Sequence, residues 1–203
     1  LYDAWKARFG LSIYEAIGMS ECSYYLSQHP SRPVKPGSAG VPQPGHSIKL
    51  LDENLNPIAD NEEGMLCIGL DDPGLFLEYW NLTDTTNASR KGNVFLTGDY
   101  AYRDSEGYIW FLGRKDDLIN SFGYRISPHE IERVLKTHPM IADCVALEEN
   151  IGKDKNIVIA CVILHQDSAF SEQHLISYTH EHLAKYKAPK KFYVMKEFPR
   201  TAN

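Results

Sequence analysis

The stretch Gly113-Arg114-Lys115-Asp116-Asp117 places two cations next to two anions at the point where the sequence changes character. Residues 1–113 carry 8 basic and 15 acidic side chains, whereas residues 114–203 carry 13 basic and 12 acidic ones. A shift of this kind is typical of a domain boundary, although a solvated run of charges is the default interpretation of the pentapeptide alone. We therefore predict two modules joined by a segment over residues 114–118.

Short strand patterns and turns dominate the sequence before this boundary. Residues 1–10 predict the end of a helix closed by Gly10, and Pro30–Gly45 is too rich in proline and glycine for a regular element. Residues 104–107, Asp-Ser-Glu-Gly, predict a hairpin turn. The pattern predicts a small β-barrel-like or sandwich subdomain with strands at Ser12–Tyr14, Ser47–Leu51, Met65–Gly69, Val94–Leu96, Tyr100–Arg103 and Tyr108–Leu112.

A helical pattern begins after the boundary, at Ser127-Pro128-His129-Glu130. This is a capping box with proline at the first helical position, in which the serine hydroxyl and the glutamate carboxylate each bind an otherwise unpaired backbone N–H. Apolar residues follow at helical spacing until Pro139 ends the helix. The order α-β-β-α-β predicts a compact α+β domain, with later elements at Asp143–Leu147, Ile157–Leu164, Ser171–Leu183 and Phe192–Met195.

The composition is that of an ordinary globular protein, with 43% hydrophobic and 24% charged residues. The 203 residues carry 21 Lys and Arg against 27 Asp and Glu, a net charge of −6, so we expect no nucleic-acid partner. Lys185–Arg200 is locally basic, which suits a solvated face or a phosphate-bearing ligand. The longest apolar run, Ile157–Leu164, is far shorter than the roughly 20 residues that span a bilayer, so we expect no membrane span.

The cysteines and histidines give no metal-binding spacing. The four cysteines form no CxxC pair and lie in or beside apolar or small-residue stretches, which favours buried, reduced thiols in a cytoplasmic protein. His174, His180 and His182 lie close together, but residues two apart on a helix point to nearly opposite sides. Neither an HExxH motif nor a Cys/His zinc spacing is present, so we expect no zinc site.

Four local groups of residues are candidates for chemistry. Gly18-Met19-Ser20-Glu21 offers a hydroxyl and a carboxylate that could hold a phosphate with Mg²⁺. Thr97-Gly98-Asp99 ends a strand with a carboxylate whose two oxygens fit two vicinal hydroxyls. The third group is the boundary stretch, and the fourth places Gly123 and Arg125 directly before the capped helix. Taken singly, the first two groups are more often surface turns, and the third is by default a solvated run of charges.

The order and spacing of these groups resembles the ANL superfamily of adenylate-forming enzymes, which includes acyl-CoA synthetases, nonribosomal-peptide adenylation domains and luciferases. The family's Tyr-Gly-x-Thr-Glu motif is matched with Ser20 in place of threonine and Ile17 in place of an aromatic ring. Some acid–CoA ligases share the aliphatic residue. The similarity runs from about residue 12 to 203 and rests on Gly18–Glu21, Ser38–Gly45, Gly64–Gly69 with Tyr79–Asn81, Thr97–Asp99, Gly113–Asn120 and Gly123–Pro128.

The resemblance implies an AMP-forming ligase. In this family a carboxylic acid attacks the α-phosphate of ATP to give an acyl-adenylate and pyrophosphate, and a thiol then displaces AMP. The implied ligands are ATP or AMP, Mg²⁺, coenzyme A and a small carboxylic acid. Two alternatives stay open: an adenylation domain that loads a carrier-protein thiol, and a non-catalytic module that binds nucleotide or coenzyme A.

The resemblance also assigns roles to residues before the boundary. Glu15, Ala16 and Ile17 would form a wall against the adenine ring, and Gly18 would border the acyl pocket. Ser20 would hydrogen-bond the phosphates, and Glu21 would be a ligand of Mg²⁺. Asp99 would bind the ribose hydroxyls.

Four further residues receive roles at and beyond the boundary. Arg114 would assist at the ribose or the phosphates, and Asp116 would be the hinge about which the small domain rotates between the two half-reactions. Gly123, which lacks a Cβ, would let the pantetheine arm pass close to the backbone. Arg125 would add positive charge near the nucleotide.

Two departures from the family concern the ends of the sequence. Nothing before residue 12 resembles the family's phosphate loop, and residues 199–203 stop just before the Gly-Lys of the family's catalytic-lysine motif. The expected catalytic lysine would therefore lie just beyond Asn203, and no residue of this sequence is assigned as catalytic. The isolated chain is expected to be inactive without a missing N-terminal portion of the enzyme.

The expected fold class is α/β and α+β. It comprises part of a large AMP-binding domain (1–113) with the β-barrel-like subdomain, a hinge (114–118) and a small α+β C-terminal domain (119–203). We expect the small domain to be truncated just before the catalytic lysine.

Overall fold

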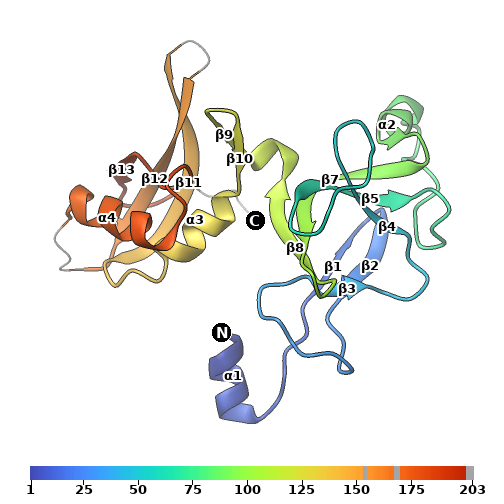
Figure 1. Cartoon of the computed structure of the whole chain (residues 1–203), viewed down its shortest axis with the longest axis horizontal. Helices are drawn as coiled ribbons and strands as arrows, with labels where there is room; N and C mark the ends of the chain where they lie inside the picture. The colour runs from blue at the N-terminus through green and yellow to red at the C-terminus, as the bar shows by residue number, and fades with distance from the viewer. Residues whose placement is uncertain (153–154, 167–169, 200–203) are drawn as a thin grey trace. The chain divides into compact units, whose positions relative to one another are not determined.

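The computed structural model describes residues 1–152, 155–166 and 170–199, and Figure 1 shows the chain. The chain divides into two compact units, Leu1–Lys115 and the residues from Asp116 onward. The division falls within the charged segment 114–118. Each unit has its own cluster of buried apolar side chains, so each has its own core.

The first unit opens its β-structure with a tight hairpin. Strands β1 (Ala16–Met19), β2 (Cys22–Ser27) and β3 (Val41–Pro42) form an antiparallel sheet in that order. The strand predicted over residues 12–14 is wrong, because the pairing with β2 begins at Ala16, opposite Ser27, and is extended only to Glu15, whose carbonyl accepts a hydrogen bond of 2.8 Å from Gln28 N. Residues 18 and 19, predicted as loop, therefore belong to β1, and Ser20 and Glu21 alone form the turn.

A larger antiparallel sheet follows in the same unit. Its order is β4 (Ile48–Leu51), β5 (Glu63–Gly69), β7 (Val94–Arg103) and β6 (Arg90–Lys91), and β8 (Ile109–Arg114) pairs with β7. The two strands predicted at 94–96 and 100–103 are one continuous strand, with a register shift in its pairing to β5 and to β8. The predicted turn at 104–107 is confirmed by the hydrogen bond from Gly107 N to Asp104 O at 2.9 Å.

Two short helices complete the first unit. The predicted N-terminal helix is confirmed as α1 (Tyr2–Phe9), which ends at Gly10 in a left-handed conformation with φ of 68°. Helix α2 (Thr83–Ala88) was not predicted, because its polar sequence has no apolar periodicity. Among the residues that the structure describes, no helix is long and apolar enough to cross a bilayer.

The second unit is an α+β domain, as predicted. A small hairpin of β9 (Ile119–Ser121) and β10 (Tyr124–Ile126) comes before α3 (Pro128–Leu135). Strands β11 (Ile141–Gly152) and β12 (Lys155–Leu164) are antiparallel and longer than predicted, and β13 (Lys191–Val194) runs parallel to β12. Helix α4 (Glu172–His182) connects β12 to β13.

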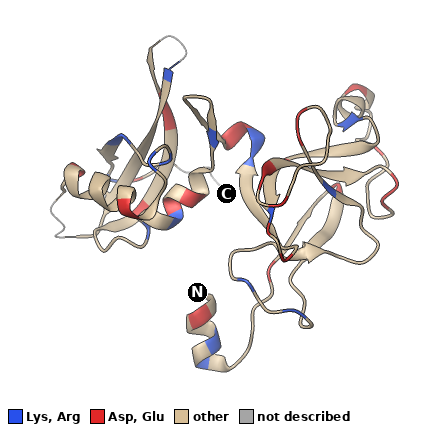
Figure 2. Cartoon of the chain, viewed as in Figure 1, with Lys and Arg blue, Asp and Glu red and all other residues tan. Residues whose placement is uncertain are grey.

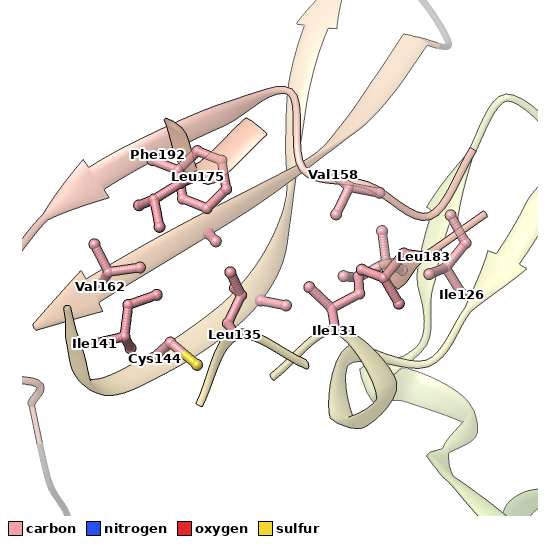
Figure 3. Packing of buried hydrophobic residues seen from close by; sticks show 13 residues of the cluster. Ile126, Ile131, Leu135, Ile141, Cys144, Val158, Val162, Leu175, Leu183 and Phe192 are labelled. Carbon is pink, nitrogen blue, oxygen red and sulfur yellow. The ribbon is translucent and has the colours of Figure 1, made fainter. Parts of the chain in front are cut away.

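The core of the second unit lies between its helices and its sheet. Ile131 and Leu135 of α3 meet Val158 and Val162 of β12, and Leu175 of α4 joins them (Figure 3).

The N-terminus of α3 departs from the capping-box expectation. Its N-cap residue, Ser127, makes no side-chain capping hydrogen bond. The carboxylate of Glu130 instead accepts a hydrogen bond of 2.6 Å from Lys187 Nζ. A tertiary ion pair therefore replaces the local contact.

Candidate functional site

Glu21 lies in the β1–β2 turn and is held by a residue 58 positions away in the sequence. The hydroxyl of Tyr79 donates a hydrogen bond of 2.6 Å to Glu21 Oε1, and Phe76 N donates one of 2.7 Å to Glu21 O. Burial and the neighbouring carboxylate raise the pKa of Tyr79 to about 12. The phenol therefore stays protonated near neutral pH and can donate its hydrogen bond to Glu21.

Asp99 and Arg114 face each other across the β7–β8 pair. Arg114 Nη1 donates to Asp99 Oδ1 at 3.1 Å and to Thr97 O at 2.8 Å. Asp99 is 8% exposed, and desolvation raises the pKa of its carboxyl while the guanidinium opposes that rise. A Cβ at Gly98 would lie 2.8 Å from Arg114 Nη2, so the glycine of Thr-Gly-Asp leaves room for the arginine.

The positive charge of Arg114 connects these two groups. It lowers the pKa of Tyr79 as well as that of Asp99, against the upward effect of burial on each. It acts in the same direction on Tyr25, a fully buried residue whose pKa is raised by burial and by Asp99. The Arg114 cation therefore acts on both groups, and together with the carboxylates of Glu21 and Asp99 it offers the chemistry for a polar ligand that carries both hydroxyl and phosphate groups.

The candidate residues before this turn, residues 15–18, lie on β1 or directly before it. Ile17 is half-buried and packs against the core of the first unit, whereas Ala16 and Gly18 are exposed. A Cβ at Gly18 would meet Tyr24 N, so the tight hairpin itself requires this glycine. The carboxylate of Glu15 accepts a hydrogen bond of 2.8 Å from Gly37 N, which ties it to the proline- and glycine-rich loop.

In the second unit two of the candidate residues, Asp116 and Gly123, lie on turns. Asp116 is exposed and belongs to the short 3₁₀ turn η1 (Lys115–Asp117), where cationic and anionic residues adjoin (Figure 2). Gly123 lies in the β9–β10 turn with φ of 84°, and a Cβ there would meet no atom within 4 Å. The need for glycine at 123 is thus conformational in this structure, and the space beside it is open.

Arg125 is an exposed residue of β10, and the residue before it, Tyr124, forms an aromatic pair. The rings of Tyr124 and Tyr186 stack with centroids 4.4 Å apart, which connects the hairpin to the start of the basic segment 185–200. Part of that segment's charge is paired, since Lys187 binds Glu130 and Lys191 binds Glu149, each at 2.6 Å.

The structure does not test the prediction about the catalytic lysine. That lysine is expected just beyond Asn203, the last residue of the sequence. Residues 200–203, including Asn203 itself, lie outside the described residues. The expectation about the lysine therefore stays a prediction from the sequence.

A hollow of about 400 Å³ lies wholly within the second unit, next to the hinge candidate. Its wall combines residues 116–120 with parts of α3 and β11. Carboxylates line it, including those of Glu132 and Glu148, and each of these two side chains is already an acceptor from a backbone N–H of the unit. We assign no ligand to this hollow, because its polar groups serve the local fold.

Sequence reasoning missed one residue of the first-unit site, Tyr79. Its hydroxyl orients Glu21, but the residue lies in a loop after β5 and its role depends on a tertiary contact. The available signal was the segment 79–81, Tyr-Trp-Asn, which matches the family pattern without indicating a function.

Comparison with known proteins identifies both halves of the chain. Residues 1–80 match the family described as AMP-binding enzyme, and residues 130–203 match the AMP-binding enzyme C-terminal domain. The chain is 35% identical to the mitochondrial acyl-coenzyme A synthetase ACSM3 of Rattus norvegicus, over 99% of this chain and 36% of that protein. It is 32% identical to the uncharacterized acyl–CoA ligase YtcI of Bacillus subtilis (strain 168), over 99% of this chain and 39% of that protein.

Solved structures show the same similarity. ATP-bound MatB from Rhodopseudomonas palustris matches with a TM-score of 0.88 and 27% identity, over 99% of this chain and 40% of that one. The O-succinylbenzoate coenzyme A synthetase MenE of Bacillus subtilis, in complex with ATP and magnesium ion, matches with a TM-score of 0.83 and 32% identity, over 96% of this chain and 40% of that one. This chain thus spans little more than a third of its relatives' length. It belongs to the ANL superfamily of adenylate-forming enzymes.

Proposed function

We propose that the chain is part of an AMP-forming acid–CoA ligase. The first unit would carry part of the nucleotide-binding site, and the second unit would be the small domain. The ligase reaction would join a carboxylic acid to coenzyme A. The carboxylate attacks the α-phosphate of ATP and releases pyrophosphate, and the thiol then attacks the acyl carbon and releases AMP. The acyl-CoA synthetases among the relatives support coenzyme A, rather than a carrier-protein thiol, as the acceptor.

The observation that carries this proposal is the ion pair between the buried Asp99 carboxylate and Arg114, whose side chain is 52% exposed. One carboxylate oxygen, Asp99 Oδ1, is bound by the guanidinium at 3.1 Å, which holds the side chain in one orientation. The free acceptor capacity of the carboxylate is suited to the two ribose hydroxyls. Because the carboxylate is largely desolvated, each hydrogen bond that it accepts from a ligand is worth more than in water.

Glu21 is our candidate ligand for Mg²⁺. A carboxylate with phosphate oxygens and water is the donor set that this hard cation prefers, and Mg²⁺ would neutralise phosphate charge when bound. Tyr79 takes one lone pair of Oε1 and keeps the carboxylate turned in a fixed direction. Ser20, the neighbouring turn residue, would donate its hydroxyl to a phosphate oxygen, and Glu15–Gly18 would flank the adenine ring and the acyl group.

The second unit would supply positive charge near the nucleotide and a path for the pantetheine arm of coenzyme A. We propose that Asp116 is the hinge, that the open space at Gly123 admits the pantetheine arm, and that Arg125 attracts the phosphates. At residue 123 the turn has φ of 84°, and a Cβ placed there would have no atom within 4 Å, which suits close approach by a ligand.

We further propose that these 203 residues alone do not catalyse adenylation. Neither the family's phosphate loop nor its catalytic lysine is found among them, and the relatives are nearly three times as long, since the chain covers 36% of ACSM3. Removing one comparable preorganised donor costs roughly 10²–10³ in rate. The complete enzyme would therefore require the remaining residues of its relatives.

The test is acid-dependent AMP release by the complete enzyme with ATP, Mg²⁺, a panel of carboxylic acids and coenzyme A. Asp99→Ala should lower kcat/KM for ATP by about 10- to 100-fold, because hydrogen bonds to a charged group contribute about 1.5–3 kcal/mol. Asp60→Ala, an exposed carboxylate of the same unit, is the control. An unchanged Asp99→Ala rate would refute the assigned site, and turnover with a carrier-protein thiol but not with coenzyme A would favour the adenylation-domain alternative.

A further inference from the structure

A second group of metal-ligand side chains lies close to Glu21 in the first unit. Cys22 opens β2, His46 lies just before β4, and Asp72 follows β5. The Sγ of Cys22 is 3.8 Å from His46 Nδ1, and that nitrogen is 3.1 Å from each carboxylate oxygen of Asp72. The three donor atoms all lie within 4.8 Å of one another.

The backbone around this cluster holds the donors in place. Asp72 is 5% exposed, and its two oxygens accept hydrogen bonds from Ser47 N at 2.7 Å and from Gly74 N at 2.8 Å. A Cβ at Gly74 would lie 2.8 Å from His46 Cε1 and 3.5 Å from Cys22 Sγ. The glycine therefore leaves the space that the imidazole occupies, and the carboxylate is fixed before any ligand arrives.

The distances from His46 Nδ1 to the other two donors are close to those of a tetrahedral site. With Zn–S of about 2.3 Å and Zn–N or Zn–O of about 2.0–2.1 Å, two donors of a tetrahedral zinc site lie about 3.3–3.6 Å apart. The observed separations of 3.8 and 3.1 Å differ from these values by only a few tenths of an ångström. The His46 side chain is 17% exposed, whereas Cys22 and Asp72 are buried.

We propose that Cys22, His46 and Asp72 bind a borderline-soft divalent cation of the Zn²⁺ type, with water as the fourth ligand. The thiolate and imidazole donors select against Mg²⁺ and Ca²⁺, which prefer oxygen. The inference does not depend on the proposed function, because it rests on a different donor set. Separations of 24 and 26 residues lie outside any zinc-finger spacing, so the sequence alone did not indicate the site.

Cation binding would also fix the turn that carries Ser20 and Glu21. Cys22 follows Glu21 directly, and the loop after Asp72 is tied to the same turn by the hydrogen bond from Phe76 N to Glu21 O. The ion would thus join three segments that are far apart in the sequence. A ligand that binds only the folded state raises stability by mass action, so Zn²⁺ should raise the Tm of the first unit.

The experiment is a titration of the full 203-residue chain with Co²⁺, which takes the same ligands as Zn²⁺ and absorbs light. We expect one equivalent to give a Co–thiolate charge-transfer band, and Zn²⁺ to abolish it by displacement while excess Mg²⁺ does not. Cys22→Ser should lose the band. Cys67→Ser, which removes another buried thiol of the same unit, should keep it.

If Cys22→Ser fails to fold, as judged by circular dichroism, the partly exposed residue His46 provides a second test. His46→Ala should fold and bind Co²⁺ at least tenfold more weakly, with the thiolate band shifted in position. The proposal is overturned if the unmodified chain gives no thiolate band, or if Cys22→Ser keeps the band. It is also overturned if His46→Ala binds Co²⁺ with unchanged affinity, because the cluster would then be only a hydrogen-bonded His–Asp pair beside a packed thiol.

Discussion

The two units hold their candidate residues in opposite ways. In the first unit Asp99 and Arg114 lie on paired strands, and the former is 8% exposed. In the second unit Asp116 and Gly123 lie on exposed turns, and the space beside the glycine is open. A preorganised set of charges suits tight binding of one ligand, whereas exposed turns suit residues that must move or admit a chain. Under the proposed function, binding would therefore belong to the first unit and motion to the second.

The largest expected effect tests whether the cores are separate. Leu135→Ala removes a fully buried side chain from the second unit and should lower its free energy of unfolding by about 2–5 kcal/mol. All three tryptophans, at positions 5, 80 and 110, lie in the first unit, so tryptophan fluorescence follows that unit alone. In urea, Leu135→Ala should shift the circular dichroism transition and leave the fluorescence transition in place.

Two control variants sharpen that result. Leu147→Ala, at a position 45% exposed in the second unit, should change stability by less than about 0.5 kcal/mol. Leu66→Ala, in the core of the first unit, should shift the fluorescence transition. Equal shifts of both transitions by Leu135→Ala would show that the units unfold as one and would break the comparison.

The next effect concerns acid stability of the first unit. Burial raises the pKa of Asp104, but hydrogen bonds from Lys35, Trp110 and the backbone outweigh it and lower this pKa from 3.8 to about 2. A depressed carboxyl pKa stabilises the fold above about pH 4, and this contribution is lost as the pH falls from about 4 to 2. Asp104→Asn should remove about 2 kcal/mol of pH-dependent stability, measured by urea unfolding at several pH values.

The control for this prediction is Asp60→Asn, because the side chain of Asp60 is 44% exposed and its ion pair with Arg103 lies on the surface. It should leave the slope of stability against pH nearly unchanged. The same slope in Asp104→Asn as in the unmodified protein would contradict the assignment of the acid response to this carboxylate.

A smaller effect tests motion at the boundary. Proline fixes φ, so Asp116→Pro should slow thioester formation by the complete enzyme about tenfold while acyl-adenylate formation changes less than about twofold. Single-turnover assays of each half-reaction measure this difference. Asp116→Ala, which keeps rotation free, should affect both half-reactions little. Equal losses in the two half-reactions of the proline variant would argue against a hinge at this residue.

The smallest effect concerns the orientation of Glu21. Tyr79→Phe removes the hydrogen bond of 2.6 Å to Glu21 Oε1, worth about 1 kcal/mol. The Mg²⁺ concentration for half-maximal activity of the complete enzyme should therefore rise about fivefold. Tyr14→Phe, at a position 43% exposed, is the matched control. No change in the Mg²⁺ requirement would show that Tyr79 does not position the carboxylate.

The motif residues, the longer strands and three helices were predictable, whereas β1, β2, α2 and the β9–β10 hairpin were missed, and so were the tertiary contacts. Strand alternation and the spacing around Pro128 indicate sheets in the first module and an α+β second module, because both patterns are local. The partner of Glu21 is set by a loop 58 residues away. The predicted capping box at α3 differs in the structure, because the Glu130 carboxylate accepts a hydrogen bond from Lys187, a residue distant in the sequence. The Cys22, His46 and Asp72 side chains come from three segments that are far apart in the sequence. No local spacing could therefore predict that they meet.

The most direct test of the central claim is a double-mutant cycle on ribose recognition at Asp99. The complete enzyme and its Asp99→Ala variant are each titrated calorimetrically with AMP and with 2′-deoxy-AMP. If the carboxylate binds the ribose hydroxyls, loss of the 2′-hydroxyl should weaken binding to the unmodified enzyme about tenfold and should not weaken binding to the variant further. An equal loss in both proteins would contradict the assignment of the nucleotide to this site of the first unit.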